Sequence, residues 1–180
     1  MGYAAIMREE IDSAKLERFM RELGAIPNAT GNIYFTGGAT ALLMEWRATT
    51  IDIDIKLDPE PKGVFARIAA LKDTLDINVE LASPDQFIPE VPGWRERSQF
   101  IARHGGISFF HYDFYSQALA KIERWHDRDR IDVHAMLERG IVAPRRLAEL
   151  FGEIEPRLIR YPAIDPASFR ARLEQLTLEG

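Results

Sequence analysis

The sequence predicts an α/β (α+β) protein, in which a small mixed sheet is flanked by helices and followed by a helical C-terminal part. Three observations carry this prediction. Short apolar, β-branched runs alternate with helix-spaced ones in the first half, a hairpin pattern follows around Gly105 and Gly106, and only helical spacing appears from Asp113 onward. We therefore place an α/β core in residues 1–112 and a helical region, packed on that core as one compact unit, in residues 113–180.

The first half alternates regularly between helix and strand. Apolar residues from Leu16 to Leu23 follow the i, i+3, i+4, i+7 spacing of an amphipathic helix, and Gly24 is placed to end it as a left-handed cap. Apolar, β-branched runs next to turn residues predict the strands. The expected order is then strand 33–36, helix 39–46, strand 50–56, helix 62–75 and strand 77–82.

The second half predicts a loop, a hairpin and four helices. The Pro-rich stretch 83–93 is expected to be a loop, and Trp94, next to it, either anchors a surface loop or stacks on RNA. A hairpin is expected over 100–111. Capping residues and prolines then mark the helices. The expected helices are 113–125, 129–139, one opened by Pro144 and one opened by Asp165-Pro166.

Composition limits the classes of function. The hydrophobic fraction of 46% supplies a real core, and the absence of cysteine excludes disulfides, thiolate zinc sites and cysteine nucleophiles. A net charge of −5 argues against non-specific nucleic-acid binding by overall charge. No apolar run approaches the roughly 20 residues that span a bilayer. The N-terminus lacks the layout of a signal peptide, so we expect a cytoplasmic protein without membrane association.

The chemistry is concentrated in Asp52-Ile53-Asp54-Ile55. Because strand side chains alternate between faces, the two carboxylates share one face, with Cα atoms about 6–7 Å apart. Two such carboxylates repel each other unless a cation lies between them. Hard Mg²⁺, or Mn²⁺ in its place, suits oxygen ligands and completes its shell with water and substrate phosphates. The pattern predicts a metal site at Asp52 and Asp54.

A Gly-Gly turn complements the carboxylates. Gly37 and Gly38 lie between a predicted strand and a predicted helix, where backbone N–H groups can approach phosphate oxygens closely. Polar residues nearby are placed to bind the same triphosphate. These are Thr40, Arg47 and Thr50, with Thr49 beside them. Either feature alone is more simply a turn or a solvated strand face, but their order along the chain favours a nucleotide site.

The segment from Phe35-Thr36-Gly37-Gly38 to Asp52-Ile53-Asp54 resembles the signature of the polymerase-β-like nucleotidyltransferases. More closely, the chain is similar to small proteins related to the abortive-infection nucleotidyltransferase toxins, the AbiEii-like group. That group continues with a helix bearing a lysine and an Arg-Asp-x-x-Asp element, matched here by Lys121 to Arg124 and Arg128 to Asp132. The resemblance covers about residues 33–140.

The resemblance implies roles for individual residues. Asp52 and Asp54 would bind metal, Gly37 and Gly38 would form the phosphate turn, and Lys121 with Arg124 would contact the triphosphate. Asp129 would complete the acidic site, with Asp132 in support. From the residues alone, the helical charges also fit a solvated, salt-bridged surface. The strand after Asp76 offers Asn78 and Glu80 on one face, so either Glu80 or Asp129 is the candidate third carboxylate.

These residues predict a metal-dependent nucleotidyltransferase that moves an NMP from an NTP to an acceptor hydroxyl. By resemblance the acceptor is an RNA 3′ end, such as that of a tRNA, or a protein, and the enzyme is the toxin of a toxin–antitoxin pair with a cognate antitoxin as partner. The alternative is a catalytically degenerate nucleotide-binding or regulatory interaction module, which the acidic balance and the uncertain third carboxylate favour.

Overall fold

The computed structural model describes residues 8–179, and the first seven residues, on which part of the export prediction rests, lie outside them. By its internal contacts the chain divides into two units. The first comprises the residues up to Leu81 together with Phe100–Phe110, and the second comprises Ala82–Gln99 and the residues from His111 on. Residues 82–99, expected within the α/β core, thus belong with the helices. Among the described residues, no helix has both the length and the apolar composition needed to cross a membrane.

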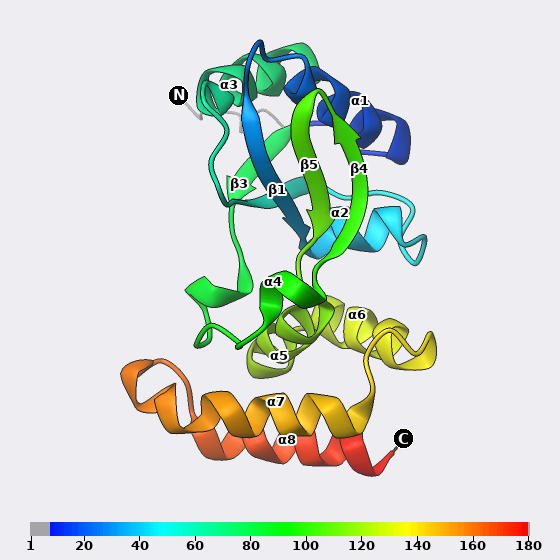
Figure 1. Cartoon of the computed structure of the whole chain (residues 1–180). Coiled ribbons are helices and arrows are strands. Elements are labelled where there is room, and N and C mark those ends of the chain that lie inside the picture. The colour runs from blue at the N-terminus through cyan, green and yellow to red at the C-terminus, as the bar shows by residue number, and fades with distance from the viewer. Residues whose placement is uncertain (1–7, 180) are drawn as a thin grey trace, which may run out of the picture. The chain divides into compact units, whose positions relative to one another are not determined.

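The first unit is built on a five-stranded mixed sheet with strand order β3-β2-β1-β5-β4 (Figure 1). β1 pairs antiparallel with β2, and β2 pairs parallel with β3. A parallel neighbour requires a crossover connection, which α3 supplies. The strands are β1 Thr30–Thr36, β2 Asp52–Leu57, β3 Asn78–Leu81, β4 Gln99–His104 and β5 Gly106–His111, and the helices are α1 Ser13–Gly24, α2 Gly37–Leu43 and α3 Val64–Thr74. This arrangement confirms the predicted fold class.

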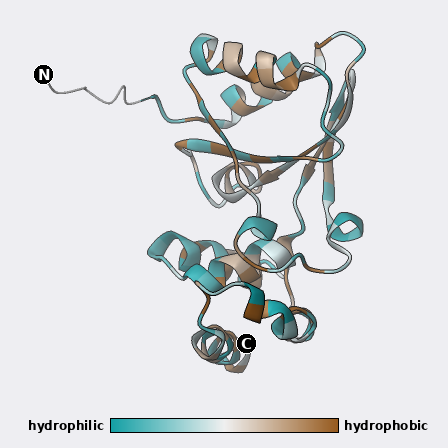
Figure 2. Cartoon of the chain, turned by 90° about the vertical axis from the view of Figure 1, so that its left-hand side faces the viewer, coloured by the Kyte–Doolittle hydropathy of each residue, from teal (hydrophilic) through white to brown (hydrophobic). Residues whose placement is uncertain are grey.

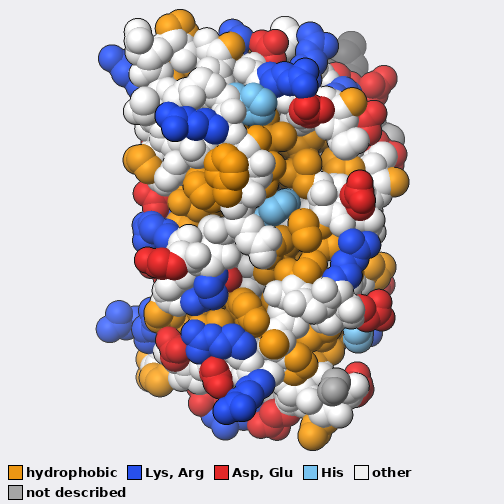
Figure 3. Space-filling model, turned by 45° about the vertical axis from the view of Figure 1, so that its right-hand side comes forward, with side chains coloured by type: hydrophobic (Ala, Val, Ile, Leu, Met, Phe, Trp, Pro, Cys, Tyr) orange, Lys and Arg blue, Asp and Glu red, His pale blue; other side chains and the backbone are white. Residues whose placement is uncertain are grey.

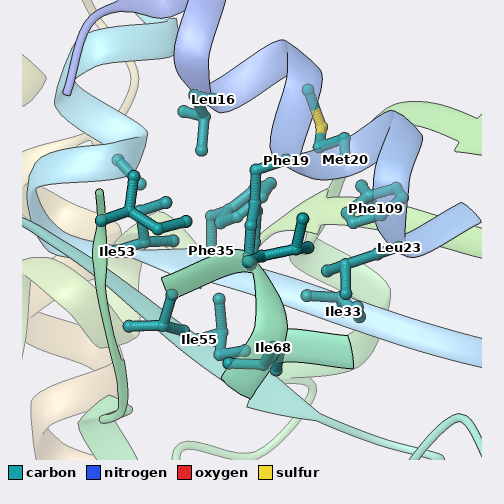
Figure 4. Close-up of a cluster of buried hydrophobic side chains, with 14 of the residues drawn as sticks. Leu16, Phe19, Met20, Leu23, Ile33, Phe35, Ile53, Ile55, Ile68 and Phe109 are labelled. Carbon is teal, nitrogen blue, oxygen red and sulfur yellow. The ribbon is translucent and has the colours of Figure 1, made fainter. Parts of the chain in front are cut away.

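One face of the sheet is covered by α1 and α3. The core of the first unit lies between this face and the two helices. Figure 4 shows the apolar side chains of both helices and three strands pointing into one cluster. The alternation expected of half-buried strands is kept, since Ile53 and Ile55 are 0% and 1% exposed while Asp52 and Asp54 lie on the other face. α1 buries its apolar residues at helical spacing instead, and both hydrophobic (brown) and hydrophilic (teal) residues occur along the helices in Figure 2.

Three predicted details of the first unit are wrong. Gly24 is no left-handed cap, because the helix ends in right-handed Ala25, and glycine is instead required since a Cβ there would lie 2.3 Å from the Cβ of His104. The helix expected over 39–46 runs from Gly37 to Leu43 and ends before Glu45, whose φ of 65° is left-handed. Thr50 is not part of β2 but forms an isolated bridge with Ile11.

The second unit is helical. Its main helices are α5 Phe114–Arg124, α6 Asp127–Glu138, α7 Pro144–Ile154 and α8 Pro166–Leu178, with the short α4 Trp94–Arg97 and the 3₁₀ turns η1 Pro84–Gln86 and η2 Glu155–Arg160. The predicted caps are present, because Asp113 accepts hydrogen bonds from the backbone N–H groups of Tyr115 and Ser116, and Asp165 accepts one from Ala167.

Two contacts show how the second unit is tied together. Arg172 on α8 donates to the carbonyls of Ile122 and Glu123 near the end of α5. Trp94 is 1% exposed and stacks on Tyr112 with ring centroids 4.5 Å apart, so it anchors a helical turn rather than a loop. A ring buried in this way has no face open for stacking on RNA, which settles the two readings of Trp94 in favour of the anchor.

Candidate active site

The face of the sheet opposite the buried Ile53 and Ile55 carries the predicted carboxylates. Asp52 and Asp54 lie two residues apart on β2, and both side chains are partly exposed. In the parallel register of β2 and β3, Asp52 pairs with Asn78 and Asp54 pairs with Glu80. Paired residues of neighbouring strands lie on the same face, about 4.8 Å apart along the sheet. The face therefore presents three carboxylates and one amide on two adjacent strands.

Asn78 links two of these carboxylates. Its Nδ2 donates to Asp52 Oδ1 at 2.6 Å and to Glu80 Oε1 at 3.1 Å. Thr36, the last residue of β1, pairs with Asp54 from the other side in the antiparallel register. Sequence reasoning did not select Thr36 as a site residue. Its signal was the alternation of β1, which puts Tyr34 and Thr36 on the face opposite the buried Phe35.

The Gly-Gly turn lies directly against Asp54. β1 ends at Thr36 and α2 begins directly at Gly37, so the Gly-Gly turn that the sequence predicts between strand and helix is the first turn of α2 itself. Gly37 has a φ of 58°, and a Cβ on it would lie 2.8 Å from Asp54 Oδ2. Glycine is thus required both by the left-handed backbone and by the close approach of the carboxylate. The turn and the metal-binding candidate form one continuous site.

Gly38 brings two further predicted residues to the turn. A Cβ on Gly38 would lie 2.0 Å from Thr50 Oγ1 and 3.2 Å from Arg47 Nη1. The guanidinium of Arg47 therefore lies beside the turn, where a positive charge would attract phosphate. Two of the predicted hydroxyls have contacts within the fold. Thr40 Oγ1 donates to the Phe35 carbonyl at 3.2 Å, and Thr50 Oγ1 donates to the Asp52 carbonyl at 3.1 Å.

The donor set on this face fits a hard divalent cation. Mg²⁺ is commonly held by one or two carboxylates, with water and substrate phosphates as the remaining ligands. Asp52 and Asp54 supply that number on one strand face. Within residues 8–179, no group of three or more Asp, Glu or His side chains is arranged to hold a metal ion by itself. The arrangement therefore suits a metal ion that takes some of its ligands from the phosphates of a substrate.

The predicted residues of α5 and α6 form a separate group in the second unit. Lys121 Nζ donates to Asp132 Oδ2 at 2.8 Å and lies 3.8 Å from Asp129 Oδ1. Arg124 donates to both oxygens of Asp129, at 2.8 and 2.6 Å. The side chains of Asp129 and Asp132 are 1% and 2% exposed. Two buried carboxylates thus pair with the nearly buried Lys121 and with Arg124, whose side chain is 52% exposed.

Asp129 also caps α6. Its Oδ2 accepts a hydrogen bond from the backbone N–H of His126 at 2.9 Å. Burial of this carboxyl opposes its ionisation, but the hydrogen bonds from Arg124 and His126 outweigh that effect and hold the pKa of Asp129 below its usual range. The predicted i, i+3 relation of Asp129 and Asp132 is therefore realised as a buried ion network rather than as an exposed, salt-bridged surface.

The predicted site residues fall into two groups, one in each unit. The first unit brings together Gly37, Gly38, Arg47, Thr50, Asp52, Asp54 and Glu80 around one turn and one strand face, with Thr40 buried beneath. The second unit brings together Lys121, Arg124, Asp129 and Asp132.

A comparison with known families gives one match. A family model described as "Nucleotidyltransferase of unknown function (DUF6036)" matches residues 14–157. The match covers most of the chain and includes both groups of predicted residues. No curated protein and no solved structure gives a significant match.

Proposed function

The chain belongs to this family of nucleotidyltransferases, and from that premise we propose that it transfers a nucleoside monophosphate from an NTP to an acceptor hydroxyl. The observation that carries the proposal is the contact of the Gly37 turn with the Asp54 carboxylate, on the strand face that also holds Asp52. A phosphate-binding turn and a pair of metal-binding carboxylates are the two parts that phosphoryl chemistry needs side by side.

In the proposed reaction the acceptor oxygen bonds to the α-phosphorus, the bond from that phosphorus to the bridging oxygen breaks, and pyrophosphate leaves. Asp52 and Asp54 would hold Mg²⁺ or Mn²⁺, which supplies charge stabilisation at the attacking and leaving oxygens. The N–H groups at Gly37 and Gly38, with the guanidinium of Arg47, bind and orient the phosphates. Glu80, exposed beside Asp54, is the carboxylate of the first unit that accepts the hydroxyl proton.

The second group has a proposed role as well. By the resemblance, Lys121 and Arg124 would contact the triphosphate and Asp129 would serve as an alternative third acid. Their buried ion network gives the same residues a structural role. The two roles lead to different results when Lys121 is replaced, because only a contact with nucleotide makes its loss weaken NTP binding in a protein that is still folded.

The acceptor and the biological role follow from the resemblance to the abortive-infection toxins. We expect an RNA 3′ end, with tRNA as the first candidate, or a protein hydroxyl, and a cognate antitoxin as partner. On the face shown in Figure 3, basic and acidic side chains are interspersed. With a net charge of −5, overall charge supplies little attraction for RNA, so acceptor recognition depends on local contacts.

The test is incubation of the protein with each labelled NTP, Mg²⁺, and total cellular RNA and protein. We expect label in a macromolecular band for the wild type, and a loss of more than about 100-fold for Asp54→Asn, since changing an outer-shell partner alone costs 10–100-fold. Asp73→Asn, which removes the same charge from the exposed surface of α3, is the matched control and should label normally. Equal labelling by Asp54→Asn would refute the assignment of the metal site.

A second candidate function is nucleotide binding without transfer. It is favoured by Asn78, which stands beside Asp52 where a third acid would complete a three-carboxylate site. The same assay separates the two functions. Metal-dependent NTP binding with no label transferred to any RNA or protein would identify a binding module.

A further inference from the structure

Asn78 occupies a particular place among the carboxylates of the sheet face. It lies beside Asp52 in the parallel register, and Glu80 follows it on the same face of β3. Its amide nitrogen is within hydrogen-bond distance of Asp52 Oδ1, at 2.6 Å, and of Glu80 Oε1, at 3.1 Å. The amide thus joins a metal-binding candidate to the candidate third acid.

The direction of these hydrogen bonds is fixed by the partners. An ionised carboxylate only accepts hydrogen bonds, so the Asn78 side chain must turn its NH₂ group, and not its oxygen, toward Asp52 and Glu80. The NH₂ group has two hydrogens, one for each carboxylate. Hydrogen bonds to ionised acceptors are the stronger kind, and a donor between two anions offsets their repulsion. The neutral Asn78 amide therefore reduces the repulsion between Asp52 and Glu80, as a cation between them would.

This arrangement limits what is left for a metal. Asn78 occupies one acceptor site of Asp52 Oδ1, and among the described residues Oδ2 is the oxygen of that carboxylate without a side-chain hydrogen bond. The same amide nitrogen also engages Glu80 Oε1. Mg²⁺ held by two carboxylates takes its remaining ligands from water and from the phosphates of the substrate.

On the basis of the proposed function, we propose that Asn78 is a positioning residue that couples metal binding to nucleotide binding. It orients Asp52 and engages Glu80 in a hydrogen bond, so the divalent cation binds with the triphosphate and only weakly before it. The third carboxylate of a preformed metal site is replaced here by an amide. The enzyme thereby takes up its metal as the metal–NTP complex.

The experiment is titration of the protein with Mn²⁺, followed by the paramagnetic signal of free Mn²⁺, with and without a non-hydrolysable ATP analogue. For the wild type we expect the analogue to tighten Mn²⁺ binding at least about 10-fold. Asn78→Asp replaces the donor by a carboxylate, and it should tighten Mn²⁺ binding at least about 10-fold without nucleotide and reduce the effect of the analogue. Gln99→Glu, which adds the same charge at the exposed start of β4, should leave Mn²⁺ binding unchanged.

A second variant tests whether the Asn78 amide itself is needed to orient Asp52. Asn78→Ala adds no acid, and we expect it to weaken Mn²⁺ binding in the presence of the analogue by about 10-fold, because Asp52 is no longer oriented. Wild-type protein that binds Mn²⁺ equally well with and without analogue, or Asn78→Ala that behaves as wild type, would overturn the inference. Loss of Mn²⁺–analogue binding in Asp54→Asn is a separate result, so the metal site can stand while the role of Asn78 fails.

Discussion

Replacement of Lys121 by Ala is the most informative perturbation, because the structure predicts its cost. The Lys121 side chain is 10% exposed, and its ammonium group pairs with Asp132, which is 2% exposed. Removing one partner of a buried ion pair leaves the other charge uncompensated and costs about 3–5 kcal/mol. An exposed pair would cost only about 0–1 kcal/mol. We therefore expect Lys121→Ala to lower the free energy of unfolding by about 3–5 kcal/mol.

Urea unfolding followed by tryptophan fluorescence measures this cost. Two of the three tryptophans, Trp94 and Trp125, lie in the second unit, at α4 and at the end of α5, so in a Trp46→Phe background the emission reports the unfolding of the unit that contains Lys121. With a slope of about 2 kcal/mol per molar urea, the expected loss moves the midpoint down by about 1.5–2.5 M. Lys62→Ala removes an exposed lysine of the first unit and should change stability by less than about 0.5 kcal/mol.

The double variant Lys121→Ala with Asp132→Ala tests the reasoning directly. If the cost comes from an uncompensated Asp132, removing that carboxylate as well should recover part of the lost stability, and the coupling energy should exceed about 1 kcal/mol. A loss below 1 kcal/mol for Lys121→Ala would refute the buried network. NTP binding, measured under native conditions on folded Lys121→Ala, then decides its second role, since a triphosphate contact requires a loss of about 10-fold or more.

Two further predictions follow from the packing. Gly38→Ala places a Cβ 2.0 Å from Thr50 Oγ1. We therefore expect the unfolding free energy to fall by about 1–3 kcal/mol and NTP binding to be lost. Gly152→Ala, in open space on α7, is the control and should be neutral or stabilising by about 0.5–1 kcal/mol. Burial lowers the pKa of His111 from 6.5 to about 4, so between these values the unfolded chain binds more protons than the folded one. The unfolding free energy should therefore fall by up to about 3 kcal/mol as the pH drops from 6.5 to 4 and stay level above about pH 7. His111→Gln should remove most of this slope in urea midpoints measured across the pH range, and an unchanged slope would show that other groups cause it.

The sequence by itself determined the element types and most of their order. The period of the apolar residues is a local property, so the helix from Ser13 and the alternating β2 could be predicted from spacing alone. The same alternation placed Asp52 and Asp54 on one face. Caps are local as well, and Asp113 and Asp165 were identified because their side chains bond the next few backbone N–H groups.

Contacts between distant residues were decided only by the tertiary structure. Gly24 looked like a helix cap, but it is glycine because the chain near His104 passes too close for a Cβ. Asn78 meets Asp52 across 26 positions of sequence, through a register that α3 and the parallel pairing set. Nothing in the local pattern distinguishes a bridging amide from a solvated one.

For the charged residues of α5 and α6 as well, the sequence determined the charge pattern and the tertiary structure decided its role. Their alternating signs are visible in the sequence, and they fit both a solvated surface and a catalytic element. The fold buries Asp129 and Asp132 and surrounds them with Lys121 and Arg124. Charge type and helical spacing are written in the sequence, but burial, which decides how much a charge pair contributes, depends on which helices pack together.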